Sequence, residues 1–205
     1  MTYDQARYVA KEVRRTLQIE RLKTRKRVVA RLSRDEEKKL IQQAYKEKGE
    51  RGLLIKTLFQ TGARVSEFAS IKVEHFFFDE LMILIAKGKG GKSRYVPILP
   101  ELAQELRTHL GNRQAGYLFE TNRHSAYSSR RLQQIVKETA EHAGITKKVH
   151  PHLLRHSVAT MLLERGMPLE QIQKFLGHSN LETTQIYAES TTAMLKESYR
   201  KALSE

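Results

Sequence analysis

From residue 33 onward, apolar residues recur every three or four positions, the spacing that places them on one face of an α-helix. Ser33 and Glu36 form a capping box, S-x-x-E, so a first helix is predicted to start here and to end at Gly49. A second helix is predicted to stop at Gly62, because glycine suits the end of a helix. A short third helix is expected from about residue 64 to 71.

The middle of the chain has the only strand-like pattern. Residues 76–78 and 81–85 are rich in Phe, Leu and Ile, and they are separated by an acidic turn. Residues 87–92 are glycine-rich and predict a flexible hairpin tip, after which residues 94–98 return as a third strand. These segments predict a three-stranded antiparallel sheet, with Pro97 on an edge strand because proline cannot donate a ladder hydrogen bond.

The rest of the chain reads as helical. Proline or serine marks the expected helix starts at Pro100, Ser128 and Pro168, and another helix is expected from about His152. Two short helices are predicted to finish the chain. The predicted fold class is therefore mostly α with one small three-stranded antiparallel sheet.

Charge narrows the choice of partner. The 205 residues include 37 Lys and Arg against 23 Asp and Glu, a formal net charge of +14 with a pI near 10.0. A basic protein with enough apolar residues for a core is a candidate for binding a polyanion, and nucleic acid is favoured. There is no cysteine and no apolar run long enough to span a membrane, so a cytoplasmic location is expected.

The first segment of the chain is unusually basic. Residues 1–31 hold ten Lys or Arg residues and three acidic ones, a net charge of +7. A solvated helix or ragged terminus would account for this, and so would an arm or linker that lies along DNA phosphates. We therefore treat residues 1–30 as a basic N-terminal arm or linker, with the globular part beginning at residue 31.

Five separated clusters contain the groups that a phosphoryl transfer without a metal ion needs. Their central residues are Arg64, Lys89, His152 with Arg155, His178, and Tyr187. Taken singly, each has an ordinary interpretation: Arg64 could pair with Glu67, His152 could be a hydrogen-bonded core residue, and Tyr187 could serve packing.

The three histidines between residues 150 and 156 also suggest a metal site. However, His150 and His156 are expected on other helical faces than His152, and no acidic ligand lies beside them in the sequence. A metal-dependent nuclease would need clustered carboxylates, which are not found in suitable places. We therefore predict neither a metal ion nor a cofactor.

Taken together, four segments resemble the tyrosine recombinase (phage integrase) family, which shares its catalytic plan with type IB topoisomerases. The matching segments are T-G-A-R-V-S-E at 61–67, G-K-G-G-K-S-R-Y-V-P-I at 88–98, H-P-H-L-L-R-H-S-V-A-T at 150–160 and L-G-H-S-N-L-E-T-T-Q-I-Y at 176–187. The resemblance covers residues 31–190, which would be the catalytic domain. Family members usually carry a further N-terminal helical domain, so this chain is expected to be either shortened or a minimal member.

The resemblance implies a role for each residue. Arg64 and Arg155 would clamp the non-bridging oxygens of the scissile phosphate, because planar guanidiniums bind such oxygens with paired hydrogen bonds. His178 would donate a further hydrogen bond to the phosphate. Glu67 would orient Arg64 from behind.

The resemblance also implies how the proton moves. Tyr187 would attack the phosphate and form a 3′-phosphotyrosyl bond, with His152 as general base. Lys89 would protonate the leaving 5′-oxygen. The implied function is site-specific DNA recombination or integration; the alternatives are strand relaxation like that of a type IB topoisomerase, and a DNA-binding protein whose catalytic site has decayed.

The end of the chain predicts an assembly element. Leu195, Tyr199, Ala202 and Leu203 form one apolar stripe within a helical tail, residues 191–205. This stripe needs a surface, either on its own domain or on a neighbouring protomer. The resemblance favours the second alternative and implies a tetramer on paired sites in double-stranded DNA, held through exchanged tails.

Overall fold

The computed structural model describes residues 31–86, 93–177 and 188–203, although the side chains of residues 188–195 are not described. These ranges belong to one compact unit, Arg31–Glu205. Most described residues are helical, and the only sheet among them has three antiparallel strands. The predicted fold class is confirmed.

Most helices begin and end close to the residues predicted from N-caps, prolines and glycines. In chain order they are α2 Arg34–Lys46, α3 Arg51–Thr61, α4 Val65–Ala69, α5 Pro100–Leu110, α6 Ser129–His142, α7 Pro151–Glu164, α8 Leu169–Leu176 and α9 Ala188–Leu203, with a 3-10 turn, η1, at Val73–His75. The predicted capping box of α2 is present, since Ser33 Oγ accepts from the Glu36 N–H at 3.2 Å while the Glu36 carboxylate accepts from the Ser33 N–H at 2.7 Å.

Some boundaries differ from the prediction. Helix α2 ends at Lys46, before Gly49, and α4 is shorter than the expected span 64–71. Helix α7 begins at Pro151 rather than near His152, because His150 supplies its N-cap and proline is favoured in the first turn. At the chain end one helix of 16 residues, α9, is described. The prediction of two short helices after Gly177 is tested only in part, because residues 178–187 lie outside the described ranges.

The sheet has the order β1-β2-β3, with β1 Phe76–Phe77, β2 Met82–Ile85 and β3 Arg94–Pro97. Ile83 pairs with Phe76 on one side and Val96 on the other, and Met82 pairs with Pro97. Pro97 therefore lies on an edge strand, as predicted. The hairpin tip, residues 87–92, lies outside the described part of the chain.

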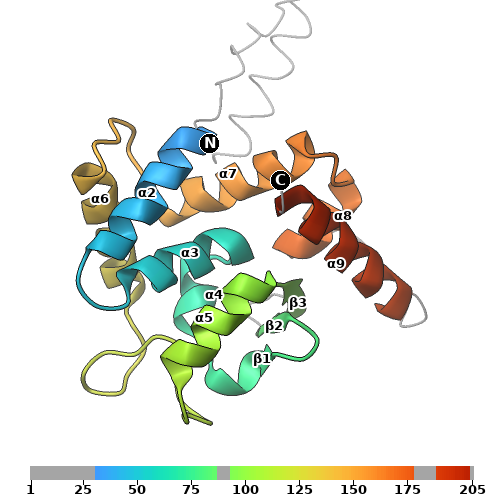
Figure 1. Cartoon of the computed structure of the whole chain (residues 1–205), viewed down its shortest axis with the longest axis horizontal. Helices are drawn as coiled ribbons and strands as arrows, with labels where there is room; N and C mark the ends of the chain where they lie inside the picture. Colours follow the sequence, from blue (N-terminus) through green and yellow to red (C-terminus); the bar gives the residue numbers. More distant parts are fainter. Residues whose placement is uncertain (1–30, 87–92, 178–187, 204–205) are drawn as a thin grey trace, which may run out of the picture. The chain divides into compact units, whose positions relative to one another are not determined.

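Helix α3 lies at the centre of the unit, with α7 on one side and α4, α5 and the sheet on the other (Figure 1). It is buried almost all round, including Leu54, Ile55 and Leu58, which have at most 1% exposure. A helix that is apolar on every face is expected in a core. Within the described ranges, every helix is too short or too polar to cross a lipid bilayer.

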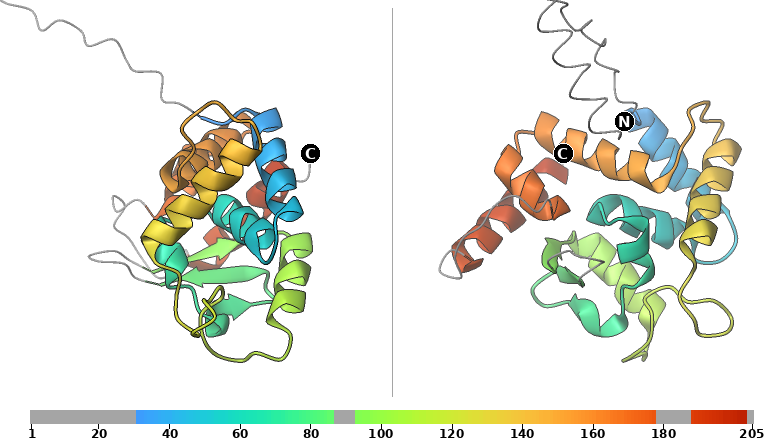
Figure 2. Two further views of the ribbon diagram at one scale, coloured as in Figure 1. Left: turned by 90° about the vertical axis from the view of Figure 1, so that its left-hand side faces the viewer. Right: turned by 180° about the vertical axis from the view of Figure 1, so that it is seen from behind.

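Helix α9 packs on its own domain through its C-terminal half. Tyr199 is 1% exposed, its ring lies 5.5 Å from that of Phe175, and its hydroxyl donates to the Gln60 carbonyl at 2.9 Å. Ala202 is equally buried, and its carbonyl accepts from Arg165. Figure 2 shows α9 running along the end of the unit beside α8. In the single chain, the described part of the apolar stripe thus packs on its own domain, which is one of the two predicted surfaces. The side chain of Leu195 is not described.

Candidate active site

A hollow of about 600 Å³ opens where the start of α4 meets the start of α7. Its lining includes Arg64, His152 and Arg155, three of the six residues predicted to act on DNA. Lys148 and His150 line it too. The hollow is thus lined by groups that carry or can accept a positive charge, as expected where an anion binds.

Arg64 projects from the break between α3 and α4. Gly62 ends α3 in the left-handed conformation, with φ +55°, and Arg64 then takes extended backbone angles as the N-cap of α4. Its side chain is 50% exposed, and Nη1 donates to Glu67 Oε1 at 2.7 Å. The backbone N–H of Arg64 also donates to Glu67 Oε2 at 2.9 Å. Glu67 thus holds Arg64 through both its backbone and its side chain.

Glu67 has a second cationic partner, Arg94, which the sequence reasoning missed. Arg94 Nη2 lies 3.0 Å from Glu67 Oε2, and both side chains are below 10% exposed. Burial alone would raise the pKa of Glu67, but the hydrogen bonds and charges of Arg94 and Arg64 outweigh it and lower the pKa to about 2. Glu67 is therefore a buried carboxylate that stays ionised between two guanidiniums.

Arg155 is fixed by the ends of two helices. Nη1 donates to the carbonyl of Gly62, which closes α3, and Nη2 donates to the carbonyl of Leu176, the last residue of α8; both distances are 2.6 Å. Burial, and then the charges of Arg64 and Arg94, lower its pKa to about 10. Arg155 therefore stays protonated at neutral pH.

His152 is exposed at the start of α7 and lines the hollow, so it is not a core histidine. His150 differs from the prediction. As the N-cap it precedes the helix, so the expected separation of helical faces does not apply, and its ring lies parallel to that of His152 with centroids 6.4 Å apart. Its Nδ1 accepts from the Leu153 N–H at 3.2 Å. Burial, followed by the charges of His152 and Lys148, lowers the pKa of His150.

The other three predicted site residues lie outside the described part of the chain. They are Lys89, in the hairpin tip between β2 and β3, and His178 and Tyr187, between α8 and α9. Two described residues lie next to these segments in the sequence. Arg94, on β3, donates to Glu67, and Gly177, at the end of α8, lies against the Arg94 side chain.

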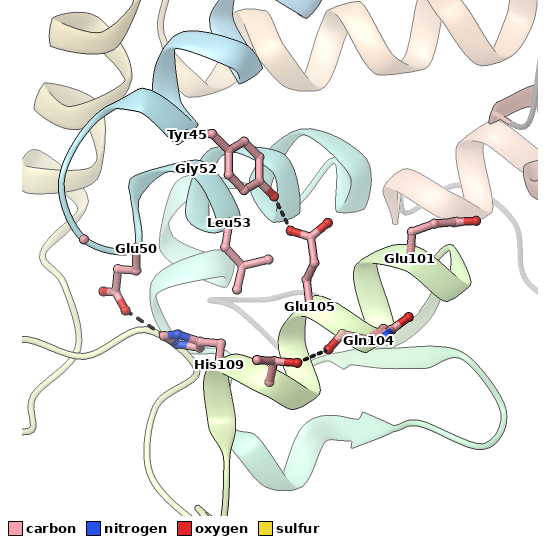
Figure 3. A pocket seen from close by; sticks show the side chains of 10 residues that line it. Tyr45, Glu50, Gly52, Leu53, Glu101, Gln104, Glu105 and His109 are labelled. Carbon is pink, nitrogen blue, oxygen red and sulfur yellow. Dashed lines mark hydrogen bonds and ion pairs between the residues drawn. The ribbon is translucent and has the colours of Figure 1, made fainter.

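A second hollow, of about 550 Å³, lies between α5 and the turn that joins α2 to α3 (Figure 3). Several of its polar groups are directed at one another: Tyr45 donates to Glu105, and His109 lies 3.5 Å from Glu50. Glu105 also pairs with Lys56 at 2.6 Å. Burial and the bond to the Glu105 carboxylate raise the pKa of Tyr45. This hollow therefore presents neither an anion clamp nor an activated nucleophile.

Comparison with known proteins adds the decisive observation: the model of the phage integrase family matches residues 30–194. The chain belongs to this family. Tyrosine recombinase XerA of Pyrococcus furiosus is 41% identical over 176 residues, which is 83% of this chain and 61% of XerA. Tyrosine recombinase XerC of Lacticaseibacillus casei is 38% identical over 158 residues, covering 72% of this chain and 53% of XerC.

Solved structures of family members share the fold. A crystal structure of XerA recombinase matches with a TM-score of 0.68 at 33% identity, over 85% of this chain and 65% of the other. A pre-cleavage complex of the XerH site-specific recombinase bound to difH substrate matches with a TM-score of 0.62 at 26% identity, over 80% and 53%. The chain thus spans about three fifths of the length of the XerA relatives it matches.

Proposed function

We propose that this family member cuts and rejoins DNA at specific sites through a covalent bond to Tyr187. The observation that carries the proposal is the convergence of Arg64, His152 and Arg155 on one hollow, with the buried Glu67 carboxylate behind Arg64. Two guanidiniums and an imidazole facing one space suit a phosphodiester, because negative charge builds up on its non-bridging oxygens during transfer.

The two arginines would contribute differently. Arg155 is held by two backbone carbonyls, which use two of the five N–H donors of its guanidinium, so it offers a donor of fixed direction. Arg64 is half exposed and is oriented by Glu67, so it can extend toward the phosphate. Donors positioned in advance need no rearrangement as charge develops, which is the larger part of catalysis in such a reaction.

The proposed cleavage step moves one phosphoryl group and two protons. The Tyr187 phenolic oxygen forms a bond to phosphorus as the bond from phosphorus to the 5′-oxygen breaks. His152 takes the phenolic proton and Lys89 gives a proton to the leaving oxygen, while His178 donates a hydrogen bond to the phosphate. Attack by a 5′-hydroxyl of another strand reverses the step. The energy of the broken bond stays in the phosphotyrosine, so no ATP is required. Arg64, Arg155 and Lys89 would supply the positive charge that a metal ion would otherwise provide.

Three other tyrosines are poorer candidates for the nucleophile than Tyr187. Burial raises the pKa of Tyr45, Tyr127 and Tyr199, and the buried Tyr199 hydroxyl is committed to a backbone carbonyl. A raised pKa makes a phenol a poorer nucleophile at neutral pH. Tyr187, eleven residues after Leu176 at the end of α8, occupies the family position in the segment 176–187.

Double-stranded DNA is the proposed substrate and the cytoplasm the proposed compartment. The formal charge of +14 suits a polyanion, and the similar XerH was solved with its difH substrate. We favour recombination over simple relaxation because the relatives are named site-specific or tyrosine recombinases. A decayed DNA-binding protein is disfavoured, because such a protein has no need of the buried Glu67 carboxylate that holds Arg64.

We also propose that protomers assemble as a tetramer on paired sites through the tail, residues 191–205. The described half of α9 lies on its own domain in the single chain, so exchange would require α9 to leave that surface. Deleting residues 192–205 is expected to prevent assembly on paired sites, as measured by sedimentation with DNA. A shortened chain that assembles normally, or one that simply unfolds in a melting curve, would contradict the exchange.

The test of the proposed function is trapping of the covalent intermediate. Nicked duplexes tiled across the DNA that flanks the gene are incubated with the protein in EDTA, and adducts are separated on a denaturing gel. The nick lets the short strand diffuse away after cleavage, so the phosphotyrosyl bond accumulates. Wild type is expected to form an adduct on at least one duplex.

Tyr187→Phe is the matched control, because it removes one oxygen and keeps the ring. It should bind the same duplex and form no adduct, whereas a surviving adduct would place the nucleophile elsewhere. Cleavage that disappears in EDTA and returns with magnesium would contradict the metal-independent step. Absence of any wild-type adduct, with DNA binding retained, would favour the decayed DNA-binding protein.

A further inference from the structure

We propose that Arg94 is a positioning residue for strand cleavage, which holds Glu67, and through it Arg64, in place. It also ties strand β3 to the end of helix α8. This inference rests on the proposed function, since it assigns Arg94 a part in the same reaction. The family resemblance had marked the segment around Arg94 only for the lysine at its tip.

Arg94 joins three segments that are distant in the sequence. It begins β3, its Nη2 donates to Glu67 Oε2 of α4 at 3.0 Å, and its Nε donates to the Phe175 carbonyl of α8 at 2.8 Å. Glu67 Oε1 accepts from Arg64 on its other side. Each carboxylate oxygen thus accepts from a different guanidinium, and Oε2 also accepts from the Arg64 backbone N–H. Arg94 therefore helps to determine which way the carboxylate faces and hence where the Arg64 side chain is held.

Direct contact between Arg94 and DNA does not fit the geometry. The lining of the hollow includes Arg64 and Arg155 but not Arg94, whose side chain is 9% exposed and has two nitrogens that already donate to protein oxygens. A guanidinium in this position can act on the phosphate only through the groups that it holds. This separates a positioning role from that of the two clamping arginines.

The backbone around Arg94 leaves space for it. Gly177 follows α8 with φ +69°, and a Cβ atom there would lie 2.9 Å from Arg94 Nη1 and 3.0 Å from its Cδ. A side chain at residue 177 would thus collide with the arginine as well as strain the backbone. The end of α8 is closed by a residue that leaves room for this guanidinium.

The same helix end also serves Arg155. Adjacent carbonyls of α8 hold the two arginines, Phe175 binding Arg94 and Leu176 binding Arg155. Cations at a helix C-terminus are stabilised by the partial negative charge there. Loss of Arg94 would therefore release Glu67 and loosen the helix end that orients Arg155, so both phosphate-clamping arginines would be displaced together.

An ordinary stabilising ion pair is the competing interpretation, and Arg51 provides the matched control for it. Arg51 pairs with Glu47 at 2.7 Å and Glu138 at 2.9 Å, with a side chain 22% exposed, and none of the three lines the hollow that holds Arg64. Arg94→Met and Arg51→Met therefore each remove a guanidinium with two acceptors and keep the apolar stem. Only the first is expected to affect cleavage.

The experiment measures the single-turnover rate of adduct formation and DNA affinity on the suicide duplex. Arg94→Met should slow cleavage by about 10²-fold, the effect of a displacement of about 1 Å at the reacting groups, while affinity changes little. Arg94→Lys should recover only part of the rate, because one ammonium cannot reproduce the planar fork to both Glu67 and the Phe175 carbonyl. Arg51→Met should lower the melting temperature and leave the rate unchanged.

A double-mutant cycle with Glu67→Gln shows whether Arg94 acts through Glu67. The two rate effects should be strongly non-additive, since the second change removes what the first has already displaced. Additive effects, an unaltered rate in Arg94→Met, or an equal loss in Arg51→Met would each overturn the proposal.

A separate measurement covers failure of the proposed function itself. If wild type forms no adduct on any duplex, NMR titration of the Glu67 carboxyl still tests the contact. Arg94→Met should raise the pKa of Glu67 toward its ordinary value, whereas Arg51→Met should leave it where it is. An unchanged titration in Arg94→Met would overturn the positioning role whatever the activity of the wild type.

Discussion

Glu67→Gln should make the stability of this domain less dependent on pH. In the wild type, the Glu67 carboxylate is buried between Arg64 and Arg94, and the pKa of Glu67 falls from 4.5 to about 2. Glutamine keeps the shape and removes the charge. Its amide oxygen can accept from one arginine, but its NH₂ group then faces the other, so one ion pair is replaced by a contact between donors.

The lowered pKa sets the magnitude and the sign. A difference of about 2.5 units corresponds to roughly 3 kcal/mol of folding free energy. This stabilisation is fully present above the unfolded pKa of about 4.5 and is lost as the pH falls toward about 2. Between about pH 7 and about pH 3 the wild type should lose roughly 2 kcal/mol from Glu67 alone, and Glu67→Gln has no such contribution to lose.

Urea denaturation at both pH values, followed by far-UV circular dichroism, measures this difference. The stability gap between wild type and Glu67→Gln should narrow by roughly 2 kcal/mol on acidification, because the other carboxylates are common to both proteins. Glu37→Gln is a control of opposite sign, since burial raises the pKa of Glu37 against the lowering charges of nearby basic residues. It should be more stable than wild type at neutral pH and lose that advantage in acid.

A gap between wild type and Glu67→Gln that stays the same at both pH values would refute the reasoning. The Glu67 carboxyl would then titrate alike in the folded and unfolded states, and Arg64 and Arg94 could not be holding it. If both variants instead gained stability relative to wild type on acidification, the change would reflect a general acid effect rather than Glu67.

Three further outcomes are expected. Gly62→Ala should destabilise the fold by more than about 1 kcal/mol, because φ is +55° and a Cβ would lie 3.0 Å from the Phe175 ring; an unchanged melting temperature would contradict this. Tyr199→Phe should cost about 1 kcal/mol by loss of the bond to Gln60, and Tyr199→Ala about 3–5 kcal/mol; stability equal to wild type would mean that α9 does not pack on its own domain in solution. His150→Ser keeps an N-cap acceptor without a titrating ring. Because a lowered histidine pKa means that stability is lost as the pH falls below about 6.5, this variant should lose less stability than wild type in urea titrations at mildly acidic pH; an identical loss would exclude His150 as the titrating group.

The fold was predictable because the residues that start and end its helices act locally. The Ser33 capping box, the prolines at helix starts and the glycine at residue 62 depend on residues three or four positions away, and the structure has each of them. The sheet was equally predictable from strand-forming residues around two turns, with Pro97 restricted to an edge. The boundaries that differ lie at helix ends: α2 ends before Gly49, α4 is shorter than expected, and α7 starts at Pro151 with His150 as its N-cap.

The candidate site was only partly predictable, and the reason is physical. Arg64 and Glu67 are three residues apart, so their pairing could be anticipated from the helix. The link from Arg94 to Glu67 spans 27 residues and depends on how β3 packs against α4 and α8, which periodicity does not encode. One signal was available: Arg94 opens a strand whose other members are mostly apolar, and a charged residue there needs a buried partner.

The helix ends at Gly62 and Gly177 explain how Arg64 and Arg155 are held in place. Gly62 and Gly177 each end a helix in the left-handed conformation, and α3 and α8 both finish beside Arg155, which lines the hollow. Arg155 binds the Gly62 carbonyl and the Leu176 carbonyl, so one buried cation joins the two helix ends, where the partial negative charge of each helix favours it. In the sequence, a predicted phosphate-binding residue follows each glycine within two positions, Arg64 after the first and His178 after the second. Helix termination thus determines where the Arg64 side chain leaves the backbone and also supplies the carbonyl groups that fix Arg155.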